Sequence, residues 1–420
     1  MRLLLISLDA AFQPDATTLL RLPHLGALAD QGVFCDNVRT IYPSITYPAH
    51  TSLLTGCYPD KHGIGHNEKF NPRLPASKRP WHWDAADIQV ETLHQAARRA
   101  GREVASILWP VSGHNRDIRY NLPEVHALPG ESQVLKILSY GSAGWLLKSE
   151  LKYGRTRESY RQPHLDSFAT TLAEQLILKQ YAPHRTDGKA GVQQNPKDHM
   201  PDVLTLHLVD LDATRHQHGV SGEQVQMALV RLDQCVGRLL RALDTVDARS
   251  STIVAVVSDH GQAEVTGVLA LDEWLQQQGL PARAQSLGLG AYIRCTREDV
   301  PEVYEALKAN QDLLHLKHTY TRQELRAMHA PQDVLLAVEP EEGVEIIDNA
   351  DDEPHRATHG FGPDHPAGAC LLWLSGPPFL QGARLRSANL VDIAPTLAHA
   401  LHLELPQAQG RVLREAFQSL

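Results

Sequence analysis

The sequence predicts an α/β fold in which a mainly parallel central sheet lies between two layers of helices. Short apolar runs rich in β-branched residues recur along the chain, and each is followed by a stretch with helical period. Buried strands that alternate with amphipathic helices are typical of βαβ units, whose crossover helices cover both faces of a parallel sheet. We therefore expect three layers, α/β/α.

Each predicted element rests on its own stretch of sequence. The apolar runs predict strands over 3–8, 104–108, 203–209, 252–257 and 370–374. Helical periodicity predicts helices over 90–101, 167–181, 225–243 and 389–403. The polar, turn-rich segment 182–201 predicts an exposed loop.

Two segments interrupt this alternation. Residues 115–163 carry scattered Gly, Pro, Arg and aromatic residues without a clear period, and residues 281–345 are expected to add a strand and a helix of their own. We interpret the whole chain, 1–420, as one catalytic domain that carries a cap segment at 115–163 and a small α/β insertion at 281–345, because α/β folds with insertions often reach this length.

The composition limits the possible partners. The formal net charge of −9 argues against electrostatic binding of a nucleic-acid polymer. A small anionic substrate is still compatible with this charge, since bound metal ions reverse the local sign. The five cysteines form no CxxC pair, so neither a disulfide framework nor a thiolate zinc site is indicated.

The opening residues indicate a location. The stretch MRLLLISLDA has too few apolar residues before its aspartate for a signal sequence or a membrane span. We expect a cytoplasmic protein that does not bind membranes. The sequence does not indicate the oligomeric state.

Residues of the types that bind metals follow several of the apolar runs, at the edge of the sheet where open α/β folds place their ligand sites. Taken singly, each of these aspartates is equally well explained as a helix cap or a turn residue, and a lone histidine as a surface group. Asp and His together suit zinc, and six ligands exceed what one tetrahedral ion takes, so two ions are the natural number. The six candidates are Asp9, Asp212, His216, Asp259, His260 and His359.

The spacing of these residues supports shared sites. Asp212 and His216 are four residues apart, so one helical turn can direct both at one ion; Asp210 and His218 compete with them. Asp259 and His260 can bind together only if the chain turns, which Gly261 permits. Four further histidines near the motifs are candidates for orienting the ligands: His62, His66, His355 and His365.

A hydroxyl group completes the pattern. Thr46 lies in the segment YPSITYPAHTSLLTG, and a metal pair could turn its side chain into a nucleophile.

Set in chain order, these motifs resemble the alkaline phosphatase superfamily, and within it the nucleotide pyrophosphatase/phosphodiesterase family. The resemblance rests on the strand that ends in Asp9, the segment YPSITYPAHTSLLTGCYPDKHGIGHN, the DxxxH of Asp212 and His216, the SDHG of Asp259 and His260, and the late HGF of His359. It implies an alkaline phosphatase-like fold.

The resemblance also implies roles for individual residues. It places Asp212, His216 and His359 on one zinc ion, and Asp9, Asp259 and His260 on the other, although Mn²⁺ or another divalent ion is also possible. Thr46 would be the nucleophile and would bridge to the second ion. Asn67 would hold a phosphoryl oxygen, while Tyr47 and Trp109, the latter in ILWPVSG, would lie against a nucleobase; packing in the core is the alternative for both aromatic residues.

The chain departs from the family pattern around DxxxH, where it has Val209, Asp210, Leu211 and Arg215, so the pocket rim is expected to differ. The CxPxR signature of sulfatases is absent from the nucleophile segment. The implied activity is hydrolysis of phosphodiester or phosphoanhydride bonds in a nucleotide-like small molecule through a phospho-threonine. A phosphonoacetate hydrolase-like enzyme and a threonine-type phosphomonoesterase are alternatives. A non-catalytic protein with structural metal ions is a third possibility.

Overall fold

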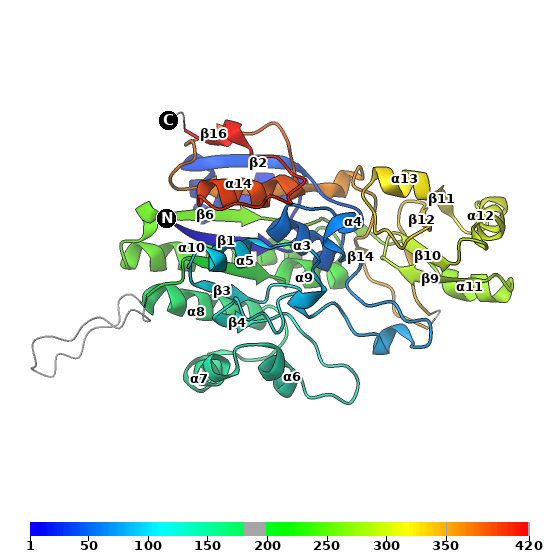
Figure 1. Ribbon diagram of the computed structural model, residues 1–420, viewed down its shortest axis with the longest axis horizontal. Coiled ribbons are helices and arrows are strands. Elements are labelled where there is room, and N and C mark those ends of the chain that lie inside the picture. Colours follow the sequence, from blue (N-terminus) through cyan, green and yellow to red (C-terminus); the bar gives the residue numbers. More distant parts are fainter. Residues whose placement is uncertain (180–198, 350, 419–420) are drawn as a thin grey trace, which may run out of the picture.

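The computed structural model describes residues 1–179, 199–349 and 351–418. Its main element is a nine-stranded sheet in which β15 is antiparallel to its two neighbours while the other paired strands run parallel (Figure 1). The order of neighbouring strands in the sheet is β16 (Ala383–Arg384), β2 (Gly32–Arg39), β15 (Ala369–Ser375), β6 (Thr252–Val257), β1 (Arg2–Leu8), β5 (Val203–Leu208), β3 (Val104–Ile107) and β4 (Tyr120–Leu122). The ninth strand, β17 (Ala388–Asn389), also pairs with β2.

Helices cover both faces of this sheet. On β1, Leu3 and Leu5 belong to one hydrophobic core and Leu4 and Ile6 to another, as expected for side chains that alternate across a strand. The first core includes α3 (Thr46–Thr55), α5 (Leu93–Arg99) and α14 (Ile393–Ala400). The second includes α2 (Pro23–Asp30), α8 (His164–Leu178) and α10 (Glu223–Thr245). The predicted three-layer α/β/α fold is confirmed.

All five predicted strands are present in the sheet, and β2, β4, β16 and β17 are additional. β2 lacks a continuous apolar run because its second half carries polar residues, two of which face solvent. β4 lies within the segment 115–163, so this part of the predicted cap belongs to the edge of the main sheet, where it pairs with β3. The rest of that segment includes α6 (Gln133–Tyr140) and α7 (Ala143–Tyr153), drawn below the sheet in Figure 1.

Residues 281–345 contain a second, antiparallel sheet rather than one strand and one helix. It lies at the end of the molecule shown on the right of Figure 1. The order of its strands is β11 (Leu316–Tyr320), β12 (Leu336–Pro340), β10 (Ala291–Cys295) and β9 (Ala282–Ser286). The helices α12 (Val300–Ala309) and α13 (Arg322–Ala327) connect these strands, and α11 (Leu271–Gln277) packs on the same small core.

Most of the predicted loop 182–201, and the last two residues of the helix predicted over 167–181, lie outside the described residues. Within the described part of the chain, none of the helices combines the length and the apolarity needed to cross a bilayer. The five cysteines are free, and Cys295 alone among them is partly exposed.

Candidate metal centre and nucleophile

The carboxyl ends of three adjacent parallel strands bring the candidate ligands together. Asp9 follows β1, and Asp259 and His260 follow its neighbour β6. On the other side of β1, β5 leads directly into α9 (Asp210–His218), which carries Asp212 and His216 one turn apart. The sixth residue, His359, follows the short strand β14 (Ala357–Thr358).

These six residues form two groups of three. In each group, one ligand atom from every residue lies within 4.8 Å of the others: Asp212, His216 and His359 make one group, and Asp9, Asp259 and His260 make the other. The groups are neighbours, since the rings of His260 and His359 have centroids 4.1 Å apart. This is the division into two sites that the resemblance implies.

The carboxylates of the second group fit a bound cation. Asp9 Oδ1 and Asp259 Oδ2 are buried, and neither has a hydrogen-bond partner in the described structure. Burial, together with the charges of Asp259 and Asp212, raises the pKa of Asp9 well above its usual value. An ion placed between these oxygens would supply the missing partner and favour the ionised carboxylates.

His216 is oriented as a metal ligand requires. Nδ1 of His216 donates to the backbone oxygen of Ala357 at 2.9 Å, which leaves Nε2 facing Asp212 Oδ1 at 3.3 Å. Burial and the neighbouring His260 lower the pKa of His359 well below its usual value, so its ring is neutral, the form that binds metal. Fixing one ring nitrogen with a backbone carbonyl is the usual way that proteins orient a histidine ligand.

Thr46 is the first residue of α3 and lies beside the second group. Its Oγ1 is 3.3 Å from Nε2 of His260, and the residue is 8 % exposed. The preceding residue, Ile45, has no side chain that could cap the helix, so the first backbone N–H groups of α3 depend on other segments for partners. His50, one turn later, donates from Nδ1 to the backbone oxygen of Thr46 at 2.9 Å and holds this turn in place.

Asn67 reaches the same helix end from a different segment. Its Oδ1 accepts a hydrogen bond from the backbone N–H of Tyr47 at 2.9 Å. Because the carbonyl oxygen is held there, the amide NH₂ group is the part of Asn67 that can donate to another molecule. The residue is partly exposed, in agreement with such a contact.

The sequence prediction omitted two residues that orient the ligands. His207, inside β5, donates from Nε2 to Asp9 Oδ2 at 2.9 Å and from Nδ1 to the backbone oxygen of Leu108 at 3.0 Å. Burial opposes a positive charge on this ring, but hydrogen bonds with Asp9 and Glu124 raise the pKa of His207 well above its usual value. Gln262 donates to Asp212 Oδ1 at 2.5 Å.

We expect His207→Phe to weaken zinc binding by roughly 10- to 100-fold, because the loss of a residue that orients a ligand typically has this effect. Asp9 would lose the donor that turns its other oxygen toward the second group. Competition with a chromophoric chelator measures the affinity. His207→Gln, which keeps a donor, should lose less, and equal losses in the two variants would show that the hydrogen bond is unimportant.

The predicted roles of Tyr47 and Trp109 are not supported by the structure. Both side chains are fully buried, so neither presents a face to a nucleobase. The hydroxyl of Tyr47 donates to the backbone oxygen of Glu124, and its ring packs edge-on against Trp81. Trp109 packs edge-on against His50 in the core. The structure thus favours the alternative, core packing, for both.

Asp210 and Arg215, which depart from the family pattern around DxxxH, and the competing His218 are directed elsewhere. Asp210 is held by Arg231, whose Nε is 2.6 Å from Oδ2, and His218 is exposed. Arg215 is buried and pairs with Asp15 at 2.6 Å. None of the three belongs to either group of candidate ligands in the described structure.

Comparison with known proteins agrees with this geometry. Residues 3–362 match the family model of type I phosphodiesterase/nucleotide pyrophosphatase. The chain is 24 % identical over 293 residues to ectonucleotide pyrophosphatase/phosphodiesterase family member 1 of Homo sapiens. This matched region covers 67 % of this chain and 25 % of that protein. It therefore spans about a quarter of the length of that relative. It is 23 % identical to bis(5'-adenosyl)-triphosphatase ENPP4 of Bos taurus, covering 96 % of this chain and 78 % of that one.

Solved structures share the fold. Murine ectonucleotide pyrophosphatase/phosphodiesterase 5, described as an inactive threonine-to-alanine variant in complex with AMP, matches with a TM-score of 0.73 and 19 % identity over the full length of both chains. The human form of the same protein matches with a TM-score of 0.71 and 18 % identity. The match to the family model covers most of the sequence, so this chain belongs to the type I phosphodiesterase/nucleotide pyrophosphatase family.

Proposed function

We propose that this protein hydrolyses phosphodiester or phosphoanhydride bonds in nucleotide-like small molecules through a covalent phospho-threonine on Thr46. The observation that carries this proposal is the position of the Thr46 hydroxyl, 3.3 Å from His260 and directly beside two groups of metal-type ligands. A structural metal site would need neither this hydroxyl nor the donor Asn67, and structural zinc sites usually have closed, cysteine-rich shells. The geometry thus favours an enzyme over a metal-stabilised binding protein.

Two metal ions complete the proposed site. Asp212, His216 and His359 would hold one ion, while Asp9, Asp259 and His260 would hold the other. Zinc suits this set of imidazole and carboxylate ligands. When bound, the ions would stabilise negative charge on phosphoryl oxygens and favour the deprotonated form of the Thr46 hydroxyl.

The protein's own groups take part in the remaining steps of the proposed reaction. Oγ1 of Thr46 forms a bond to phosphorus while the bond from phosphorus to the leaving-group oxygen breaks, and that oxygen takes the electron pair. Water then attacks the phospho-threonine, which restores the Thr46 hydroxyl and releases the phosphorylated product. The N-terminus of α3 and the amide NH₂ of Asn67, which is held there, would stabilise the oxygens that become more negative in the transition state.

We expect Asn67→Ala to lower kcat by roughly 100- to 1,000-fold, because this is the usual loss when one donor to a developing negative charge is removed. Steady-state kinetics with a nitrophenyl ester of thymidine monophosphate measures the effect. Asn67→Asp provides the contrast, since it keeps the acceptor for the Tyr47 N–H but replaces the donor with a charge. If Asn67→Ala loses less than tenfold, Asn67 only anchors α3.

The relatives support a nucleotide as substrate. One is named a bis(5'-adenosyl)-triphosphatase, and another was solved with AMP after its threonine was changed to alanine. Because Tyr47 is buried in this chain, we do not assign it to base recognition. The expected cytoplasmic location stays a proposal, supported by five free cysteines.

A further inference from the structure

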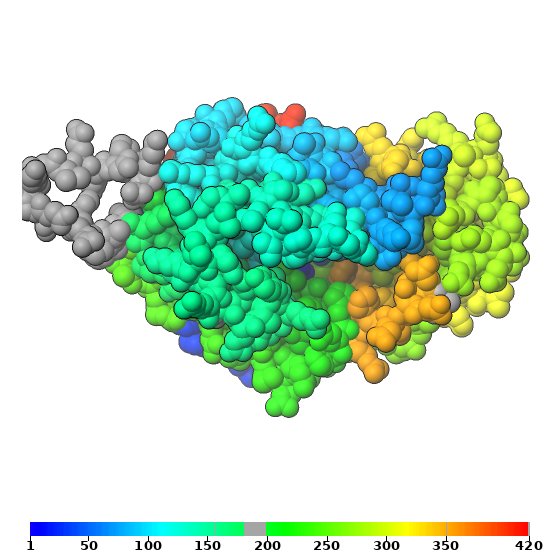
Figure 2. Space-filling view, turned by 90° about the horizontal axis from the view of Figure 1, so that it is seen from below, coloured from blue at the N-terminus to red at the C-terminus, as the bar shows by residue number. Residues whose placement is uncertain are grey.

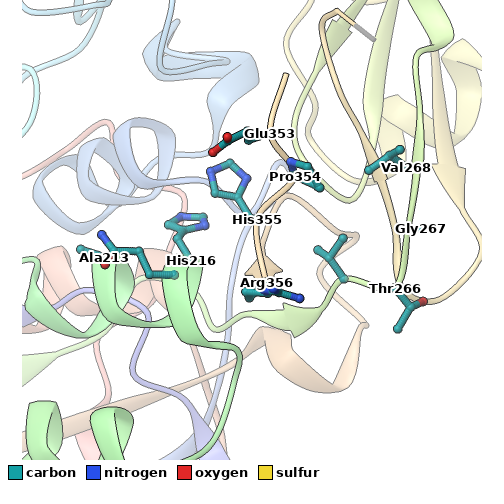
Figure 3. Close-up of a pocket in the computed structure, with 11 residues that line it drawn as sticks. Ala213, His216, Thr266, Gly267, Val268, Glu353, Pro354, His355 and Arg356 are labelled. Atoms are coloured by element: carbon teal, nitrogen blue, oxygen red, sulfur yellow. The ribbon is translucent and has the colours of Figure 1, made fainter. Parts of the chain in front are cut away.

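A pocket of about 890 Å³ opens beside the first group of ligands. Its walls come from three segments: α9, the stretch that leads into β8 (Gly267–Leu269), and residues 353–356 (Figure 3). His216 is both a candidate metal ligand and part of the wall, so a molecule bound at the metal centre can extend into this space. Figure 2 shows the segment around residues 353–356, in orange, at the surface beside the green segments.

The position of Thr46 indicates which part of a substrate would occupy the pocket. Thr46 contacts His260 of the second group. In an in-line displacement the leaving oxygen departs on the side of phosphorus opposite the nucleophile, and a metal pair stabilises the two oxygens separately. The leaving group would therefore lie toward the first group, where His216 borders the pocket.

His355 is held rigidly at this wall. Glu345, which is buried on β13 (Val344–Ile346), accepts from Nδ1 of His355 at 2.6 Å and from its backbone N–H at 2.9 Å. The ring of His355 lies 4.3 Å from that of His216, measured between centroids. A buried carboxylate thus fixes a half-exposed histidine next to a candidate metal ligand.

Arg356 adds a positive charge to the pocket. Its backbone N–H donates to the backbone oxygen of His216 at 2.8 Å, which ties the residue to α9. Its guanidinium, by contrast, forms no hydrogen bond or ion pair within the part of the chain that the structure describes. Glu353 is the acidic residue of the lining, and in Figure 3 it lies above His355, whereas Arg356 lies below His216.

We propose that this pocket binds the leaving group of the substrate and that Arg356, beside His355, contacts a phosphate on that group. The inference rests on the proposed function and assigns to this pocket a preference for substrates whose leaving group is itself a phosphate. The bond between phosphorus and the bridging oxygen breaks, and the departing phosphate keeps the oxygen and its electron pair. A guanidinium matches a phosphate in charge and in planar hydrogen-bond geometry.

Two substrates that transfer the same group test the proposal. Thymidine triphosphate and the nitrophenyl ester of thymidine monophosphate both transfer thymidylate, but the first releases pyrophosphate and the second nitrophenolate. We expect Arg356→Ala to lower the ratio of kcat/KM for the triphosphate to kcat/KM for the ester by roughly 10- to 100-fold, the usual effect of a hydrogen bond to a charged group. Arg356→Lys should restore part of the ratio, and Glu353→Gln should raise it.

Arg386→Ala is the matched control, because Arg386 is also exposed but does not line this pocket. It should leave the ratio unchanged. An Arg356→Ala variant that loses both activities equally, or neither, would overturn the proposal.

A binding measurement distinguishes a failure of this inference from a failure of the proposed function. In the Thr46→Ala variant saturated with zinc, calorimetry should show thymidine diphosphate binding more weakly, by a similar factor, when Arg356 is also replaced by alanine. If the wild-type protein cleaves neither substrate but this difference is seen, the proposed function fails and the anion-binding pocket stands. If the difference is absent, the pocket fails.

Discussion

Thr46→Ala should reduce turnover of a nucleotide phosphodiester to below about one thousandth of the wild-type rate. The hydroxyl supplies the atom that bonds to phosphorus, and alanine leaves no oxygen at the N-terminus of α3. The mutation removes little else, because the side-chain contact that Thr46 makes is the one with His260. Steady-state kinetics of the zinc-saturated variant measures the loss.

The same variant should still bind metal, since three ligands of the second group remain. Thr46→Ser is the matched control, and it should keep a substantial part of the activity because it retains a hydroxyl. Mass spectrometry of wild-type protein quenched in acid during turnover should also find the phosphorylated peptide containing Thr46. If Thr46→Ala retains a tenth of the wild-type rate, the covalent route is wrong.

Removal of the metal should have an equally large effect. We expect about two zinc ions per chain in the active protein, loss of nearly all activity after treatment with a chelator, and recovery when zinc is added. Elemental analysis and kinetics on the same samples measure both quantities. One ion per chain at full activity would contradict the two-site model.

Single substitutions should separate the two sites. His216→Ala should remove about one ion from the first group, and Asp259→Ala about one from the second. Each variant should remain folded, because the sheet has two hydrophobic cores that do not depend on these residues. Circular dichroism and thermal unfolding provide the check. His218→Ala is the control, since His218 is exposed and belongs to neither group.

Local sequence patterns could predict most of the fold, because a buried parallel strand needs a continuous apolar run whatever surrounds it. The strands at the centre of the sheet, β1, β5 and β6, have this pattern. β2 and β4 do not. The polar half of β2 is partly exposed, and β4 has three residues, too few to show a period.

The two groups of candidate metal ligands could also be predicted, since Asp9 and Asp259 lie just after the ends of such strands. His207 was overlooked because a single polar residue within a strand gives no sign of its partner, which here is contributed by a neighbouring strand. The burial of Tyr47 could not be predicted from the sequence, because it depends on Trp81 and Glu124, which come from distant segments. Arg356 lies in a loop whose apolar residues show no periodicity, and only the folded chain places it beside His216.

The charge of the substrate distinguishes phosphodiesters from phosphomonoesters at this site. A diester brings one negative charge to the metal pair, whereas a monoester brings about two and normally needs a further cation. Of the cations that come from the neighbouring segments, Lys69 pairs with Asp87, Arg79 with Glu68 and Arg294 with Asp333, while Arg356 lines the pocket that we assign to the leaving group. The side chains that form hydrogen bonds with Thr46 are those of His260, which contacts its hydroxyl, and His50, which contacts its backbone oxygen. The phosphodiesterase proposal therefore predicts a strong preference for the diester.

Comparison of kcat/KM for two nitrophenyl substrates tests this proposal most directly. For the zinc-loaded protein, we predict that the value for the nitrophenyl ester of thymidine monophosphate exceeds that for nitrophenyl phosphate by at least roughly 100-fold, about 2.7 kcal/mol of transition-state discrimination. A higher value for nitrophenyl phosphate would contradict the proposal and would identify the protein as a phosphomonoesterase.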